Sequence, residues 1–321
     1  MDNNTKKEIL FYYESRQNPN GDPGFEDQPR LMSDGTIMVT DVRIKRTIRD
    51  YAKNVMGHTL FVDFDEKGNP TTADKRRDEI LTILNLDNGP KDTIEILLKN
   101  TYDVPMFGAF IPERSETKGG GGWEKLTGPV QFGTCRSVNK VNIIHPTIST
   151  HFVGKVKKTQ EEQFSTLGRY YAVEYALIKV QGAINPGNLE DYNKKDEYNE
   201  IKQKFDQYQN KLCDYLWNGT NQLITRSKFP QRSILYIEVE YDSAIYNDLS
   251  LLVEEKEEMK GKATSLINSP FILTNLIKAA EERKEKIKSI RIKCCHELND
   301  DVKQLVNDLE LKGVPVEHLD S

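Results

Sequence analysis

The sequence has few cysteines and no long apolar segment, and both shortages narrow the class of protein. Cys135, Cys213, Cys294 and Cys295 include no C-x-x-C pair, and the adjacent Cys294 and Cys295 do not suit a disulfide framework. We therefore expect reduced, buried thiols rather than zinc ligands. No run approaches the roughly 18 apolar residues of a membrane span, and the N-terminus, MDNNTKKEIL, lacks the apolar core of a signal peptide. These features predict a cytoplasmic protein.

Catalytic signatures are also missing. The chain has no Walker or G-x-S-x-G pattern, and its histidines are scattered, with His145 and His151 at a spacing that fits no common metal site. Asp22, Asp27 and Asp34 surround the first loop, where clustered carboxylates could hold a metal or transfer protons. Turns, however, favour Asp for backbone reasons alone. We predict a binding protein with no catalytic residue, cofactor or metal, rather than an enzyme.

The third shortage is local, because one long stretch has no acidic residue. The 321 residues carry 50 acidic and 45 basic side chains, for a formal charge of -5, but Lys125–Gln160 contains no Asp or Glu. A neighbouring carboxylate would weaken a contact between Lys or Arg and a phosphate. We therefore expect one basic track on an otherwise acidic surface. Its charged members are Lys125, Arg136, Lys140, Lys155, Lys157 and Lys158, with His145 and His151 among them.

A basic helix is predicted from Thr40 to about Met56. Thr40 suits the N-cap and Gly57 is a natural stop. One face of the helix carries Ile44, Ile48, Tyr51, Ala52 and Val55, and the other carries Arg43, Lys45, Arg46, Arg49 and Lys53. Solvated helix faces usually mix charges, whereas only Asp41 and Asp50 are acidic here, so we favour phosphate binding over a solubilising surface.

A second basic cluster comprises Arg226, Lys228 and Arg232, in a loop that leads into a predicted strand. Loops at strand ends position side chains for binding, although the same residues would also suit a solubilising loop. The glycines Gly119–Gly122 are interpreted as a loop as well. A phosphate cradle would continue into Lys and Ser or Thr, and here Trp123 follows.

The apolar pattern predicts an α+β fold. Predicted strands are Glu8–Tyr13, Thr59–Phe64, Tyr170–Gln181 and Ser233–Tyr241, and predicted helices besides the basic one are Ala73–Leu84, Thr93–Lys99, Ile201–Leu216 and Ala279–Lys288. The core order of strand, helix, strand, strand, helix, strand is that of a ferredoxin-like fold. The large insertions in this order would hold the basic stretch.

Four segments point to a known family. They are Asn18–Pro23 (NPNGDP), Val39–Tyr51 (VTDVRIKRTIRDY), Leu126–Phe132 (LTGPVQF) and Tyr175–Pro186 (YALIKVQGAINP). In this order they resemble the Cas7 backbone subunits of type I CRISPR surveillance complexes (Cascade), and most closely the type I-B branch. The resemblance extends over about residues 8–240.

The resemblance implies an RRM-like palm (residues 1–241) with an inserted finger at about 60–125 and a β-hairpin thumb at about 139–167. A mixed helical extension (242–321) would pack on the palm. Copies would bind head-to-tail along a CRISPR RNA beside other Cascade subunits, and the exposed guide would pair with a target DNA strand in antiviral defence. Because base pairing reads the sequence, the protein would hold RNA backbone and shape.

The expected RNA-binding residues are Arg43, Lys45, Arg46, Arg49, Gln131, Arg136, Lys140, Arg226 and Lys228. Ile143, Ile144, Ile148 and Phe152 are candidates to wedge between bases, or ordinary strand residues. Two alternatives stay open. Related type III backbone subunits cut target RNA with a loop Asp, and Asp22, Asp27 and Asp34 lie in a comparable region. A repeat-RNA processing endonuclease would also be RRM-like, but it normally relies on a catalytic His, and no His lies in the first loop.

Overall fold

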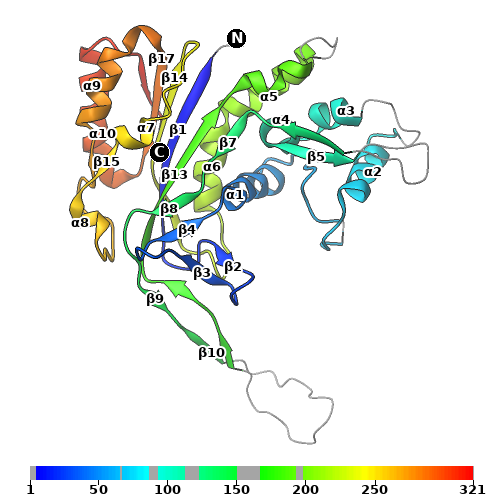
Figure 1. Cartoon of the computed structure of the whole chain (residues 1–321), viewed down its shortest axis with the longest axis horizontal. Helices are drawn as coiled ribbons and strands as arrows, with labels where there is room; N and C mark the ends of the chain where they lie inside the picture. The colour runs from blue at the N-terminus through cyan, green and yellow to red at the C-terminus, as the bar shows by residue number, and fades with distance from the viewer. Residues whose placement is uncertain are drawn as a thin grey trace, which may run out of the picture.

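The computed structural model describes residues 5–65, 67–86, 93–112, 123–149, 167–192 and 198–320. A large, mainly antiparallel sheet lies at its centre (Figure 1). Across the sheet the strands run β18 (Val316–His318), β17 (Ile287–Cys294), β14 (Gln231–Tyr241), β1 (Lys6–Ser15), β13 (Ala176–Ile184), β8 (Cys135–Ser137), β4 (Ile37–Val39), β3 (Gln28–Leu31) and β2 (Gly21–Asp22), and β7 (Val130–Phe132) also pairs with β13. The α+β prediction is confirmed at this level.

Strand β1 is the centre of the sheet and is covered on both faces. It pairs antiparallel with β13 on one side and β14 on the other. Ile9, Phe11 and Tyr13 join one hydrophobic core, and Leu10 and Tyr12 join a second core on the opposite face. A strand buried on both faces needs an unbroken apolar run, which explains why the sequence predicted it correctly.

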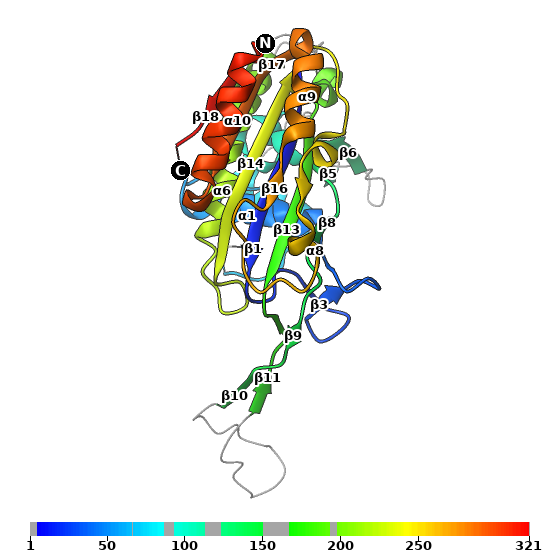
Figure 2. The same ribbon diagram turned by 90° about the vertical axis from the view of Figure 1, so that its left-hand side faces the viewer.

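Helices cover both faces of the sheet (Figures 1 and 2). The first core holds α1 (Asp41–Asn54), α5 (Tyr198–Asn210) and α6 (Leu212–Asn221), and the second holds α9 (Thr274–Glu282) and α10 (Asn299–Leu311). Smaller elements complete this C-terminal part: α7 (Leu249–Leu252), β15 (Glu254–Glu255), α8 (Glu257–Lys260), β16 (Phe271–Ile272), η2 (Lys284–Lys286) and η3 (His296–Leu298). Near the middle of the sheet the strands follow the order β14, β1, β13 and β7/β8. The last strand of the predicted core, β14, therefore lies beside the first, β1.

Two insertions leave this body. One contains α2 (Ala73–Ile83), α3 (Thr93–Asn100), α4 (Asp103–Phe107) and the paired strands β5 (Gly108–Pro112) and β6 (Trp123–Thr127). The other, which we call the arm, consists of β9 (Ile143–Ile144), β10 (Thr147–Ser149), β11 (Leu167–Arg169) and β12 (Ala172–Val173). Strand β10 pairs with β11 and β9 pairs with β12. The arm projects away from the sheet, as Figure 2 shows. The 3-10 helix η1 (Pro186–Tyr192) follows β13.

Most of the predicted elements are confirmed, including α1 with its Thr40 N-cap, whose hydroxyl accepts from the N–H of Arg43. Four predictions are wrong. The single helix expected over Ile201–Leu216 is divided at Lys211 into α5 and α6. Thr59–Phe64 is not a strand, because the N–H groups of Phe61 and Val62 bond the Asp103 carboxylate rather than a neighbouring strand. Tyr170–Gln181 is broken after β12, because the chain leaves the arm there and joins the sheet. The helix predicted at Ala279–Lys288 ends early, because Ile287 already pairs with β14.

Candidate nucleic-acid interface

The predicted cationic residues fall into two groups according to whether a carboxylate neutralises them. Four are paired, through the contacts Lys45–Asp41 (3.3 Å), Arg46–Asp50 (2.7 Å), Arg49–Asp103 (2.9 Å) and Arg136–Asp34 (2.9 Å). Arg43, Lys140, Arg226 and Lys228 have no ion pair with any residue that the structure describes. Only this second group can pair with a phosphate without first giving up an ion pair to a carboxylate of the protein.

Among these cations without an ion pair, which we call the open cations, Arg43 and Lys228 are the two whose side chains are held by hydrogen bonds to other described residues. Arg43 Nη2 donates to Thr47 Oγ1 at 2.9 Å, and Lys228 Nζ donates to the Asn18 carbonyl at 2.6 Å. Burial lowers the pKa of Arg43. Burial, and then the positive charge of Arg43, lowers the pKa of Lys228 to about 8, although Asp27 opposes that shift. Two partly desolvated cations of like charge are unfavourable alone and are stabilised by an anion.

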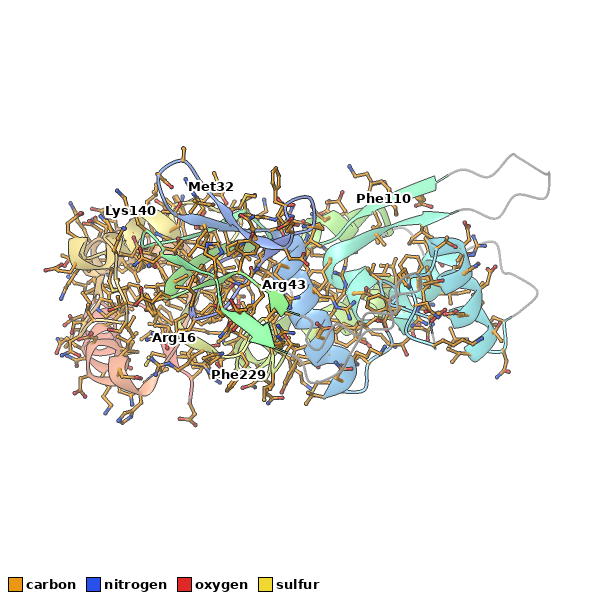
Figure 3. All side chains as sticks on the ribbon, turned by 90° about the horizontal axis from the view of Figure 1, so that it is seen from below. Arg16, Met32, Arg43, Phe110, Lys140 and Phe229 are labelled. Atoms are coloured by element: carbon orange, nitrogen blue, oxygen red, sulfur yellow. The ribbon has the colours of Figure 1, made fainter. Side chains whose placement is uncertain are left out.

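The position of Lys228 depends on contacts between distant loops. The Asn18 N–H donates to the Ser227 carbonyl (3.0 Å), and the Val173 N–H donates to the Gln17 carbonyl (3.2 Å). The loop after β1, the turn before β14 and the return strand of the arm therefore meet at one place. Figure 3 shows Arg43, Arg16 and Phe229 in the view from below, which is the side from which the arm leaves.

Contacts at this junction explain two residues of the NPNGDP segment, Gly21 and Asn20. A Cβ at Gly21 would lie 2.8 Å from the Asp27 carbonyl oxygen, so the close approach of the two sides of the loop requires glycine. Asn20 Oδ1 accepts from the hydroxyl of Thr40, the N-cap of α1. The loop is thereby attached to the helix that carries Arg43.

Arg226 and Lys140 are the other two predicted cations that have no ion pair with a described residue. Arg226 is exposed, with its guanidinium 5.1 Å from the centre of the Tyr170 ring. Lys140 is exposed, and its side chain packs beside Gly35. Sequence reasoning missed Arg16, which stands 5.1 Å over the Tyr175 ring and donates to the Thr264 carbonyl. A single Arg in a polar segment gave no signal, because only the fold brings it to the arm.

Arg49 does not fit the role predicted for it. It is buried, and its guanidinium Nε lies 2.9 Å from the fully buried Asp103 carboxylate, which also accepts the N–H groups of Phe61 and Val62. The helical pattern had placed Arg49 on the polar face and Val55 on the apolar face. In the structure Val55 is exposed and Arg49 faces the core. Arg49 therefore holds the first insertion to α1, and we leave it out of the RNA-binding set.

Lys45 and Gln131, both predicted to contact RNA, contact each other. Lys45 Nζ donates to Gln131 Oε1 at 3.1 Å, and Gln131 Nε2 donates to the Gly128 carbonyl at 2.7 Å. These bonds join α1 to β7. The LTGPVQF segment therefore has a structural role in attaching α1 to β7, in addition to any role in binding a ligand.

The loop carboxylates are held in turns. Asp22 Oδ1 accepts from the Gly24 N–H and pairs with Arg30 (3.5 Å). Hydrogen bonds from the hydroxyl and N–H of Thr36, together with nearby Arg136, hold the pKa of Asp34 below its usual value. Among the described residues no group of three or more His, Cys, Asp or Glu side chains could hold a metal ion.

The arm contains some of the predicted wedge residues. Ile144 is 41% exposed, whereas Ile143 packs against the first core. Ile148 lies on β10. The residues that lie outside the described part of the chain are His151, Phe152, Lys155, Lys157 and Lys158, and also Gly119–Gly122.

A search of the described helices finds none with the length and apolarity needed to cross a membrane.

Comparisons with known proteins place the chain in one family. The family model for "CRISPR-associated protein Cas7" matches residues 4–291. A CRISPR-associated protein Cas7 of Haloferax volcanii is 24% identical over 305 residues, which cover 89% of this chain and 86% of that protein. A chain of a CRISPR RNA-guided surveillance complex in a pre-nicking state is similar with a TM-score of 0.44 and 11% identity, covering 98% of this chain and 96% of that one. A second surveillance-complex chain gives 0.41 and 11%, covering 91% and 89%.

Proposed function

The chain belongs to the Cas7 family of CRISPR-associated proteins, and we propose that it binds CRISPR RNA as a backbone subunit of a type I surveillance complex. The observation that carries this proposal is the Arg43–Lys228 pair, two partly buried cations with no ion pair among the described residues. Such a site takes a phosphate of any nucleotide, so it suits a protein that holds a guide without reading its sequence.

We also propose an RRM-like palm. Strands β14, β1, β13 and β7/β8 would be its sheet, with α1 and α6 on one face. Residues of about 60–125 would then be the finger, the arm within about 139–167 and its return strand the thumb, and 242–321 an extension on the opposite face. The order of the strands and the common core of α1 and α6 support this division.

Head-to-tail binding of copies along the RNA, pairing of the exposed guide with target DNA, and contacts with other Cascade subunits complete the proposal. The type I-B branch remains the nearest likeness by motif. The cations without an ion pair support a backbone track built from several segments, because Arg43, Lys140 and Arg226 come from three separate parts of the chain and none is neutralised by a described carboxylate.

The direct test compares RNA binding by two charge-reversal variants. Arg43→Glu with Lys228→Glu should weaken binding of every RNA sequence and reduce the salt dependence by about 0.7 per lost phosphate contact. The matched control is Lys284→Glu with Lys303→Glu, which makes the same charge change at two exposed lysines of the C-terminal part, neither of which has an ion pair with a described residue. Equal affinity and salt slope for the two variants, both folded by circular dichroism, would remove the assigned interface.

We propose no nuclease activity, because Asp22 and Asp34 are engaged in their own turns. Guide-bound protein incubated with complementary RNA and Mg²⁺ or Mn²⁺ should leave that RNA intact. Regular cuts that disappear in Asp22→Ala or Asp34→Ala would instead establish an RNA-cleaving subunit of the type III kind.

A further inference from the structure

Two arginine–tyrosine pairs in this molecule differ in one respect. Arg283 stands 4.0 Å over the Tyr246 ring, and both of its terminal nitrogens bond the Asp248 carboxylate, at 2.9 and 2.6 Å. Arg226 stands 5.1 Å over Tyr170, but its guanidinium has no ion pair and no hydrogen bond with the described residues. The first pair is complete as a structural contact. The second leaves all the guanidinium donors available.

The Arg226–Tyr170 pair connects the arm to the turn before β14. Tyr170 directly follows β11, and its N–H lies 3.4 Å from the Pro146 carbonyl across the arm. Arg226 belongs to the same turn as Lys228, whose N–H donates to the Thr225 carbonyl. An aromatic face with an unpaired guanidinium therefore lies beside the Arg43–Lys228 phosphate site.

The neighbouring tyrosine is already engaged. The Tyr171 ring meets His145 edge to face at 4.8 Å, and its hydroxyl donates to Glu26 at 3.4 Å. Tyr170 is half-buried and has no side-chain hydrogen bond within the described ranges. Of the two, only Tyr170 has neither a contact with another aromatic ring nor a side-chain hydrogen bond among the described residues.

We propose that Tyr170 and Arg226 bind one nucleobase per subunit by stacking, while the adjoining phosphate binds Arg43 and Lys228. This inference rests on the proposed RNA-binding function. It places a base-binding position where Tyr170 of the arm meets the turn before β14. Every nucleobase has a π face, so the site would accept any base and be compatible with a guide of any sequence. The Arg226 donors would bond the phosphate or the base edge, as the Arg283 donors bond Asp248.

A crosslinking experiment tests the position on the unmodified protein. RNA oligonucleotides carrying 5-iodouridine at one position at a time are bound and irradiated, and the crosslinked peptides are sequenced. We expect one position per bound subunit to crosslink to Tyr170. Crosslinks confined to other residues, with RNA still bound, would overturn the base site and leave the proposed function intact. Absence of RNA binding would overturn both.

Variants separate stacking from a structural contact. Tyr170→Ala should weaken RNA binding about fivefold or more, whereas Tyr170→Phe, which keeps the ring, should stay close to the wild type. Phe110→Ala, which removes a 62% exposed ring far from the arm, is the control (Figure 3). An abasic nucleotide at the crosslinked position should weaken binding to the wild type but not to Tyr170→Ala. If the abasic RNA weakens binding to both proteins equally, Tyr170 does not hold that base.

Discussion

At the scale of single residues, Arg43 and Arg49 show how the surroundings of a charge decide its role. Both lie on α1, and both were predicted to meet RNA. Arg49 is neutralised by the buried Asp103, whereas Arg43 bonds only the uncharged Thr47 hydroxyl and lies near Lys228. The first arginine contributes to the stability of the fold, and the second is available to an anion.

Substitution of these two arginines should separate stability from binding. Arg49→Ala leaves the Asp103 carboxylate buried without its partner and should cost about 3–5 kcal/mol of unfolding free energy. Arg43→Ala leaves no carboxylate behind, so it should change the Tm little and weaken RNA binding instead. Thermal unfolding and RNA titration of both variants check this. A stable Arg49→Ala protein with impaired RNA binding would reverse the assignment.

Lys228 should make RNA binding depend on pH. Its pKa is lowered from 10.5 to about 8, so the free protein loses this charge as the pH rises through about 8. A bound phosphate favours the protonated amine, so affinity should fall above that pH, by up to about tenfold per pH unit. Lys228→Arg stays charged and should remove the fall. Titrations from pH 7 to 9.5 measure it.

The effect of pH on protein stability through Lys228 should be opposite to its effect on RNA affinity. Between pH 8 and 10.5 the unfolded chain binds the proton and the folded chain does not, so the contribution of Lys228 to stability becomes more favourable as the pH rises. A loss of affinity in this range that followed unfolding, measured by circular dichroism, would contradict the binding explanation.

At the scale of elements, the arm is held along its length by its own strand pairs and at its inner end by contacts with the body. Strand β10 pairs with β11, and β9 pairs with β12, with Ile143 packing on the first core at the root. Removing only Ile143–Phe152 would leave β11 and β12 without partners. Both sides of the arm therefore have to be removed together in any test of its role.

Replacing residues 147–169 by a short Gly-Ser linker should leave the Tm nearly unchanged, because the deletion spares both hydrophobic cores. Ordered assembly on RNA should be lost, since the proposed thumb is missing. Calorimetry measures the first effect and electron microscopy of RNA-bound protein the second. Regular assemblies formed without the arm would show that it is not the thumb.

At the scale of the whole molecule, the C-terminal part is continuous with the rest. Strand β17 extends the sheet beyond β14, and Glu8 on β1 accepts the N–H groups of Tyr246, Asn247 and Leu249. This attachment covers one face of the sheet with α9 and α10. RNA binding is therefore expected at the end of the molecule where the arm leaves, away from these helices (Figure 2).

Assembly should follow the length of the RNA. A head-to-tail contact is heterologous and need not close into a ring, so the number of subunits should be set by the RNA. Mass measured by light scattering should rise in steps as the bound RNA is lengthened. A fixed mass for all RNA lengths would point to a discrete RNA-binding module instead.

The sequence alone determined the features that depend on local pattern. The EILFYY run specified β1, Thr40 specified the start of α1, and the spacing from Ile201 to Leu216 specified the buried side of α5 and α6. The family was also evident, because its four motifs are short and ordered along the chain. Each of these signals is contained in a short stretch of the chain, so no knowledge of the tertiary contacts is needed to recognise it.

Only the tertiary structure decided which cations are open. Arg49 and Arg43 have the same chemistry and share one helix, but the partner of Arg49 is Asp103, from a distant insertion. Arg226 reaches Tyr170 and Lys228 reaches the Asn18 carbonyl because loops far apart in sequence bond one another beside the arm. Ion pairing and desolvation act through space, so the sequence could identify the basic segments but not the charges left free to bind RNA.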